Sequence, residues 1–225
     1  DVLITEWIHA TNVSVGETLN KLQWVTTLHT LAEVHQITPE TTRVRLPDAV
    51  NSIRHPIDFL QTLDNCLEVV EQRSTETNIL KFIRHVLSHL KATIPHHWAF
   101  DVPRTLIHGD WQLQNFALTD GVVRFFDWEM AGWSDPAMDI GLLLSHESFA
   151  EVTAYDKNWL IETYRDISKD DSLPTRVNLY IQLLDIKWLI DALYRLTPEI
   201  ADEQQAKNQA RIELYRERIE QRYDS

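Results

Sequence analysis

The chain has 225 residues, of which 44% are hydrophobic and 24% charged, and its formal net charge is −13 at neutral pH. This length suits one large domain or two small ones and suffices to bury a sizeable core. The acidic balance argues against a nucleic-acid partner, because binding to a phosphate backbone requires clustered Lys and Arg. No apolar run approaches the roughly 20 residues of a membrane helix, so we expect no membrane partner. An acidic surface could attract a cationic small substrate or serve solubility alone.

The chain has a single cysteine, Cys66, so it can form no internal disulfide. This favours a reducing compartment, and we expect a cytoplasmic location. Leucines and a valine surround Cys66 at helical spacing, which predicts that Cys66 packs in the core and is not a nucleophile.

Helical spacing of apolar residues predominates along the chain. Residues 1–8 read as a short strand, and Ser14 or Gly16 could cap the first helix after it. The predicted helices cover residues 14–37, 56–72, 77–93, 157–168, 176–195 and 198–222, and helix also returns after Pro136. Short β-type runs lie at 105–107, 116–118 and 122–128, with the turn signal TDG between the last two. The sequence therefore predicts a mainly α fold with a small β-hairpin island.

The hairpin carries the informative side chains, in the stretch LIHGDWQLQNFALTDGVVRFFDWEMAGWSDPAMDIG. Asp110 and Asn115 lie on the loop that enters the hairpin, and Asp127 lies at the end of its second strand. Because the strands run antiparallel, the open end should bring Asn115 and Asp127 together. A carboxylate and an amide oxygen suit Mg²⁺, together with phosphate and water. Asp110 could then accept a proton from a substrate hydroxyl. The alternative is that these are ordinary turn residues and a strand-end cap.

The order of these residues resembles the catalytic loop and metal-binding Asp of kinases. His-Gly-Asp at 108–110 and Asp-Trp-Glu at 127–129 look like the aminoglycoside phosphotransferase and choline kinase family. The segment AGWSDPAMDIG is similar to that family's Gly-x-x-Asp-Pro-x-x-Asp segment. The resemblance is strong through residues 105–145 and weaker outside them.

The resemblance implies a small-molecule kinase that moves the γ-phosphate of ATP to a hydroxyl with Mg²⁺, GTP being an open alternative donor. It implies that Asp110 is the catalytic base and that Asn115 and Asp127 hold the metal. His108 would support the loop from behind. Asp139 would be a buried carboxylate that accepts backbone N–H bonds from the loop.

The resemblance also implies a division of the chain. Residues 1–8 look like the hinge between two kinase lobes, where the backbone of Glu6 and Ile8 would contact adenine; an ordinary edge strand is the alternative. Residues 9–225 would be the helical C-terminal lobe, with a catalytic hairpin at 105–128. The sequence has no glycine-rich loop and no suitable Lys–Glu pair. We therefore expect either a fragment that is inactive alone or a one-lobed relative that binds without transferring phosphate.

The acceptor pocket of that family lies among the C-terminal helices. Here Asp185 and Trp188 share a helix face, and Trp111 is next to Asp110. Aromatic faces combined with acids can hold an ammonium. We therefore expect these three residues to contact a small hydroxylated substrate that is cationic, such as choline, ethanolamine, thiamine or an aminoglycoside. The alternative is that the tryptophans belong to the core. A helical interaction protein with a chance motif is a further rival, and a protein kinase is disfavoured because no Ala-Pro-Glu triplet follows Asp127.

Overall fold

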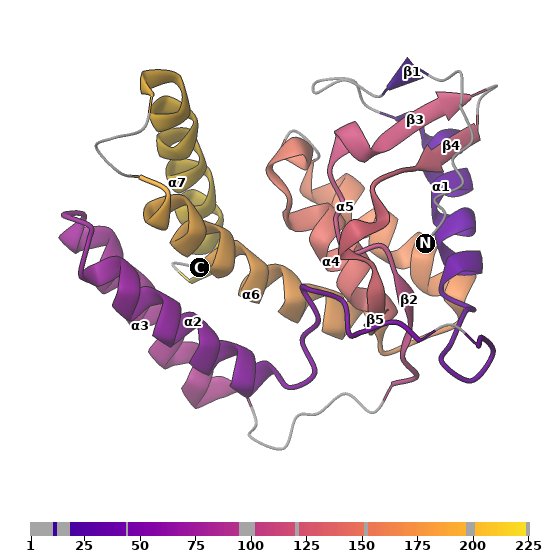
Figure 1. The fold of residues 1–225 in the computed structure, drawn as a ribbon, viewed down its shortest axis with the longest axis horizontal. Helices are drawn as coiled ribbons and strands as arrows, with labels where there is room; N and C mark the ends of the chain where they lie inside the picture. The colour runs from indigo at the N-terminus through magenta and orange to yellow at the C-terminus, as the bar shows by residue number, and fades with distance from the viewer. Residues whose placement is uncertain are drawn as a thin grey trace.

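The computed structural model describes residues 11–12, 19–43, 45–94, 102–119, 122–150, 153–196 and 201–223. These residues form seven α-helices, five short strands and three short 3-10 helices (Figure 1). The helices are α1 (Lys21–Val34), α2 (Pro56–Glu71), α3 (Thr77–Thr93), α4 (Pro136–Ser145), α5 (Ala154–Ser168), α6 (Leu173–Tyr194) and α7 (Asp202–Tyr223). The strands are β1 (Thr11–Asn12), β2 (Thr105–Ile107), β3 (Phe116–Thr119), β4 (Val122–Phe125) and β5 (Gly132–Ser134). The expected mainly α fold with a small β island is confirmed.

The strands form two small antiparallel sheets, β1-β3-β4 and β2-β5. β3 and β4 are the predicted hairpin, in which Phe116 pairs with Phe125. The hairpin is shorter than the predicted 105–128, because β2 pairs with β5 instead of with it. β4 ends at Phe125 and not at residue 128, since the 3-10 helix η2 (Trp128–Met130) follows almost at once. The sequence did not predict β1 or β5.

The helix predictions at 56–72 and 77–93 are confirmed as α2 and α3. The prediction that Ser14 or Gly16 caps the first helix was wrong, because α1 starts at Lys21 and is capped by Asn20. The Asn20 side chain accepts the backbone N–H of Gln23 at 2.9 Å, and the Gln23 side chain accepts that of Asn20 at 2.8 Å. This reciprocal pair satisfies two helix donors that would otherwise lack partners, and so sets the start of the helix.

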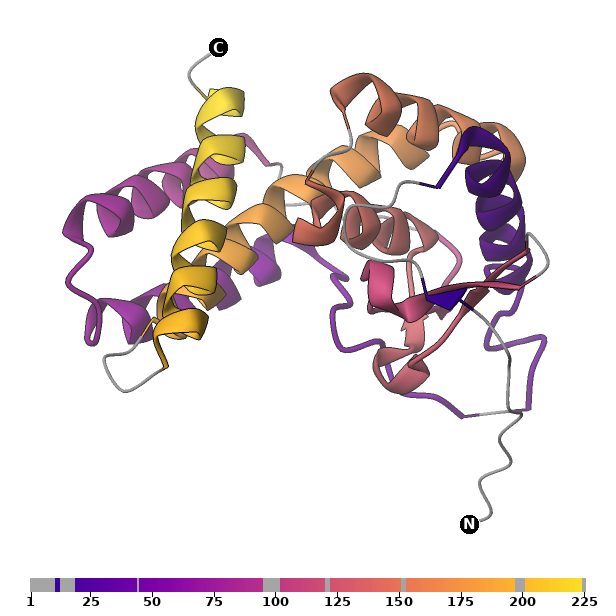
Figure 2. The same cartoon turned by 90° about the horizontal axis from the view of Figure 1, so that it is seen from above.

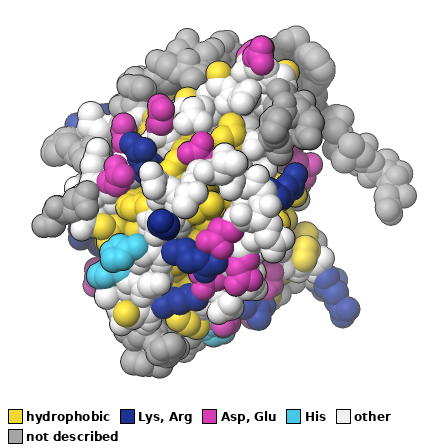
Figure 3. Space-filling model, turned by 90° about the vertical axis from the view of Figure 1, so that its left-hand side faces the viewer, with side chains coloured by type: hydrophobic (Ala, Val, Ile, Leu, Met, Phe, Trp, Pro, Cys, Tyr) yellow, Lys and Arg dark blue, Asp and Glu magenta, His cyan; other side chains and the backbone are white. Residues whose placement is uncertain are grey.

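One long helix, α6, joins the two sides of the molecule and packs against α2, α4, α5 and α7. The α2–α3 pair and α7 lie on one side of it, and the sheets with α1, α4 and α5 lie on the other (Figures 1 and 2). The face that is on the left of Figure 1 carries basic and acidic side chains close together (Figure 3). Among the described helices, none is both long and apolar enough to cross a membrane.

Helix α2 illustrates how finely periodicity selects buried positions. Its buried side chains include Leu60, Leu63, Leu67 and Val70, as the spacing predicts. Cys66 is exposed, so the prediction that it packs in the core was wrong. Each residue turns a helix by about 100°, and Cys66 therefore falls just outside the buried stripe.

Candidate active site

A single buried carboxylate holds the loop that follows β2. Asp139, in the first turn of α4, is 0% exposed. Its two oxygens accept the backbone N–H groups of His108 at 2.8 Å and Gly109 at 2.9 Å. Its Oδ2 also lies 3.1 Å from Nε2 of His35. A carboxylate removed from water requires such partners, and in return it fixes the backbone of the loop.

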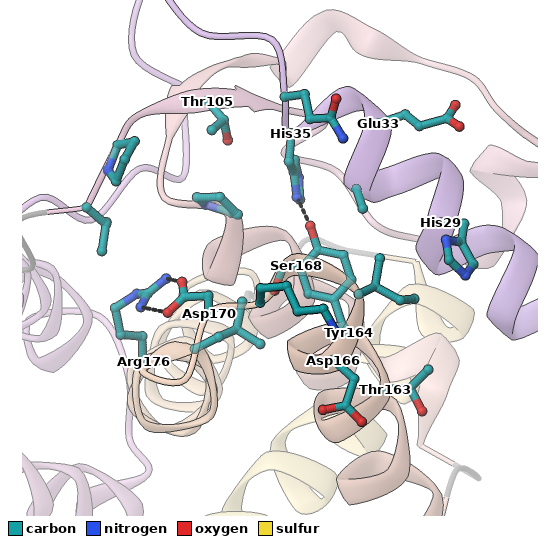
Figure 4. Close-up of a pocket in the computed structure, with 18 of the residues that line it drawn as sticks. His29, Glu33, His35, Thr105, Thr163, Tyr164, Asp166, Ser168, Asp170 and Arg176 are labelled. Carbon is teal, nitrogen blue, oxygen red and sulfur yellow. Dashed lines mark hydrogen bonds and ion pairs between the residues drawn. The ribbon is translucent and has the colours of Figure 1, made fainter.

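Behind the loop, the contact between Asp139 and His35 is continued by a second hydrogen bond of His35. His35 is buried, and its Nδ1 bonds to the hydroxyl of Tyr164 on α5 (Figure 4). Burial raises the pKa of Tyr164, so its hydroxyl keeps its proton and donates it to Nδ1. Nε2 of His35 then carries the ring proton and donates to Asp139. His35 and Tyr164 also line a cavity of about 850 Å³ between α1, β2, α5 and α6.

The ring of His108 connects the loop to the end of the hairpin. It is buried, and its Nε2 donates to the carbonyl oxygen of Phe126 at 2.6 Å. Its Nδ1 accepts the backbone N–H of Asp110 at 3.3 Å. The ring packs against Trp111 and Trp128, with centroids 5.3 and 4.6 Å away. His108 therefore spans from Asp110 to the residue before Asp127.

Residue 109 must be glycine for this loop to form. Gly109 has φ +81°, in the left-handed region that other residues rarely adopt. A Cβ on it would lie 2.6 Å from the carbonyl oxygen of Met130. Its own carbonyl accepts a hydrogen bond of 3.0 Å from the side chain of Asn51. The close approach of the loop to η2 thus explains the glycine in His-Gly-Asp.

Two amide side chains hold the carboxylate of Asp110. Nδ2 of Asn115 donates to both the carbonyl oxygen and Oδ2 of Asp110, each at 3.0 Å. Nε2 of Gln112 donates to Oδ1 at 3.0 Å and to Oδ2 at 2.8 Å. Because both carboxylate oxygens accept bonds from the loop, the orientation of the carboxylate is fixed before any ligand binds.

The open end of the hairpin brings Asn115 close to Asp127 along the backbone. The carbonyl oxygen of Asn115 accepts the N–H of Phe126 at 3.0 Å, and Asp127 is the next residue. Asp127 has φ 62° and ψ 63°, a left-handed conformation that is uncommon for a residue with a side chain. Its carboxylate is exposed and makes no hydrogen bond or ion pair with a described residue. Backbone strain of this kind is typical of functional positions.

The side-chain oxygens of Asn115 and Asp127, at the open end of the hairpin, suit a hard cation. The Nδ2 group of Asn115 is directed to Asp110, so its Oδ1 is the atom left for a metal. The free carboxylate of Asp127 supplies a second oxygen. Among the described residues, no group of three or more His, Cys, Asp and Glu side chains could hold a metal ion. Two protein oxygens, completed by phosphate and water, are what Mg²⁺ commonly takes in nucleotide sites.

A pocket of about 530 Å³ opens beside Asp110. The loop after β2, η2, α6 and α7 contribute to its wall, and Gln112, His146 and Trp188 lie in it with Asp110. Burial lowers the pKa of His146, so this ring adds no charge at neutral pH. The pocket therefore places a fixed carboxylate at the side of a small-molecule cavity.

The sequence profile described as the phosphotransferase enzyme family (APH) matches residues 1–170. The chain belongs to this phosphotransferase family. This match argues against the rival interpretation, a helical interaction protein that carries the His-Gly-Asp motif by chance. No curated protein sequence matches the chain at a significant level.

Solved structures share the fold of this protein. A choline/ethanolamine kinase family protein from Mesorhizobium loti has a TM-score of 0.59 and 19% identity, covering 96% of this chain and 73% of its own. A choline kinase from Cryptosporidium parvum has a TM-score of 0.64 and 11% identity, covering 97% and 70%. The choline kinase LicA from Streptococcus pneumoniae, in complex with AMP, has a TM-score of 0.54 and 18% identity, covering 94% and 68%. The expected kinase-like fold is confirmed.

The structure separates the three residues that were predicted to contact substrate. Of these, Trp188 alone lines the pocket beside Asp110. Asp185 is 0% exposed and forms an ion pair of 2.7 Å with Arg222 of α7, so it is not available to a substrate there. Trp111 is 2% exposed and packs against the aromatic rings of the hairpin, such as Phe116. The helix face that carries Asp185 is covered by α7, whose docking the sequence did not reveal.

The sequence did not reveal several residues that line this pocket. On α6 these are Lys187, Asp191 and Arg195, which recur at intervals of four along one helix face with Trp188. That spacing was a readable signal. Arg211 comes from α7 and carried no local signal, because its position depends on how α7 packs. Glu6 and Ile8, the predicted adenine contacts, lie outside the described residues.

Proposed function

We propose that this protein is a small-molecule kinase that transfers the γ-phosphate of ATP to a hydroxyl of an acceptor bound beside Asp110. The observation that carries the proposal is the hydrogen-bonded loop itself. It fixes the Asp110 carboxylate at the pocket and sets Asn115 and Asp127 at the adjoining hairpin mouth. Family membership supports phosphate transfer as the class of reaction.

In this proposal Asp110 accepts the proton of the acceptor hydroxyl. The hydroxyl oxygen bonds to the γ-phosphorus, and the bond to the oxygen that bridges the β- and γ-phosphates breaks, so ADP leaves. Gln112 and Asn115 keep the carboxylate oriented toward the hydroxyl. Asn115 and Asp127 would hold Mg²⁺, which neutralises charge on the phosphate oxygens when bound. His108 and Asp139 position the loop and do not touch the reacting atoms.

Nucleotide use is supported by the AMP bound to the LicA structure, and ATP is the donor that we propose, with GTP as the alternative. The backbone at Glu6 and Ile8 is the proposed adenine contact. The acceptor is a small hydroxylated molecule, as the choline and ethanolamine kinases among the similar structures suggest. A cytoplasmic location is likewise a proposal, which rests on the single cysteine.

The first test measures metal-dependent nucleotide binding through the change that it causes in the melting temperature of this chain. At a hundredfold excess over Kd, bound MgATP should add about 2.7 kcal/mol, or roughly 5–10 °C, to a chain of this size. The shift should vanish with EDTA and in Asp127→Ala, because one of the two protein oxygens is lost. Asp171→Ala, which removes an exposed carboxylate between α5 and α6, is the matched control and should keep it. A full magnesium-dependent shift in Asp127→Ala would refute the metal assignment.

The second test concerns Asp110. Asp110→Asn should retain the MgATP shift, since the side chain does not hold the metal in this proposal. In the full-length protein it should lower phosphate transfer by about 10²–10⁴-fold, the usual contribution of a general base. The measurement is ADP release in the presence of a hydroxylated acceptor. Nucleotide binding without transfer to any acceptor would instead favour a non-catalytic relative.

A further inference from the structure

Some of the charged side chains that line the pocket form ion pairs with one another, and others do not. Glu147 forms an ion pair with Arg211, whose Nη2 lies 2.5 Å from Oε1. Asp191 forms one with Arg195, at 3.0 Å. Both arginines therefore have a carboxylate partner within the protein. Among the described residues that line the pocket, this leaves Lys187 as the cation without an ion pair.

Lys187 lies in a setting that a bound anion would complete. Its Nζ lies 3.7 Å from the ring centroid of the neighbouring Trp188, and it makes no hydrogen bond or ion pair with a described residue. Burial lowers the pKa of Lys187, with the carboxylate of Asp191 opposing that effect. A cation–π contact offsets only part of the cost of removing an ammonium from water. A ligand carboxylate would supply the missing charge-assisted bond.

The same contact argues against a cationic acceptor at Trp188. An ammonium substrate would need an aromatic face, and the ammonium of Lys187 already lies over this ring. The acid that was predicted to assist, Asp185, is buried against Arg222 and does not line the pocket. The remaining carboxylates of the pocket without an arginine partner are Asp110 and the exposed Glu129.

We propose that the acceptor carries a carboxylate, which binds Lys187, in addition to the hydroxyl that reacts beside Asp110. The proposal rests on the proposed kinase function, because that function defines the pocket as the acceptor site. It names the substrate class as small hydroxy acids. Lys187 is then a specificity-determining residue on α6.

The test compares two probes of similar length that each carry a primary hydroxyl, 4-hydroxybutyrate and choline. Binding is measured by calorimetry on this chain without nucleotide, so the result does not depend on turnover. Wild type should bind 4-hydroxybutyrate more tightly than choline. Lys187→Met keeps the aliphatic stem and should raise the Kd for 4-hydroxybutyrate by about tenfold, the effect of losing one charge-assisted contact. Choline binding should be unchanged or tighter.

Two further variants make the outcome specific. Lys187→Arg keeps the positive charge and should bind 4-hydroxybutyrate nearly as wild type does. Lys81→Met removes a lysine from the exposed face of α3 and should have no effect, which controls for net charge. Loss of binding in Lys187→Arg equal to that in Lys187→Met would point to packing and overturn the proposal.

Other results would also overturn it. These are tighter binding of choline than of 4-hydroxybutyrate by wild type, no saturable binding of 4-hydroxybutyrate up to its solubility limit, and an unchanged Kd in Lys187→Met. Failure here is distinct from failure of the kinase function. A chain that shows the Asp127-dependent MgATP shift but fails these probes loses only the hydroxy-acid inference. Lys187-dependent binding without a nucleotide shift would contradict the kinase function and leave a carboxylate-binding site that is not an acceptor site.

Discussion

At the scale of single residues, Asp139 organises the site although it lies behind it. Its carboxylate joins the backbone of residues 108 and 109 to His35, and through His35 to Tyr164. The loop that presents Asp110 therefore depends on a group that no ligand reaches.

Asp139→Asn should destabilise the fold by about 3 kcal/mol, since an amide offers one acceptor oxygen where three donors converge. Urea denaturation of the two proteins measures the difference. Asp171→Asn, on the exposed turn before α6, should change stability by less than about 0.5 kcal/mol and serves as control. A cost of similar size for both variants would show that the Asp139 network does not hold the loop.

The sequence predicted the order and proximity of Asp110, Asn115 and Asp127, because the hairpin that joins them is local and its turn signal is strong. It did not predict Gln112 as the second holder of Asp110. A glutamine in a loop has no preferred partner until the backbone is fixed, so this contact became visible only in the structure.

At the scale of elements, α7 completes the pocket from a distance in sequence. It contributes Arg211 and Tyr215 to the wall, and it is attached to α6 by the ion pair between Arg222 and Asp185. Burial raises the pKa of the Asp185 carboxyl, and the arginines of α7 oppose this. The docking of α7 thus depends on a charge that is costly to bury alone.

Arg222→Met should cost about 3 kcal/mol, because it leaves the buried Asp185 with less favourable cations, namely Arg218 at 3.7 Å and Lys157. The double variant with Asp185→Asn should recover much of that loss, because the unpaired charge is gone. A double-mutant cycle by urea denaturation measures the coupling. Additive effects of the two substitutions would exclude a coupled pair.

The extent of α2 and α3 could be predicted because each has a continuous apolar stripe of period 3.6. The extent of α6 followed from its dense apolar sequence, since buried residues lie on most of its faces. The strands β1 and β5 could not, since two or three residues carry too little pattern. For α7 the helix was predictable but its partner was not, because a highly charged sequence with a narrow stripe does not specify which face of the core it meets.

At the scale of the whole molecule, a net charge of −13 coexists with a local excess of positive charge. Lys157 of α5 lies near Asp185, where Arg218 and Arg222 of α7 also converge. Burial, with the two arginines, lowers the pKa of Lys157 from 10.5 to about 8. Between those values the unfolded chain binds more protons than the folded one, so this group makes the folded state more stable as the pH rises.

Lys157→Met should therefore raise stability at pH 7, where wild type holds a disfavoured charge. The difference in unfolding free energy between the two proteins should shrink as the pH rises from about 8 to 10, because wild type loses the proton there. Parallel denaturation curves across this range measure it. A difference that stays constant with pH would show that Lys157 titrates normally.

The placement of α6 has a consequence for how this protein can acquire new chemistry. Its first half is held by the core, with Arg176 bound to Asp135 and Tyr180 packed on Gly141, while its second half supplies Lys187 and neighbouring pocket residues. At 1.5 Å per residue, Tyr180 and Lys187 are separated by roughly 10 Å along the helix axis. Exchanges in the second half can therefore change ligand preference while the contacts that anchor the first half stay intact.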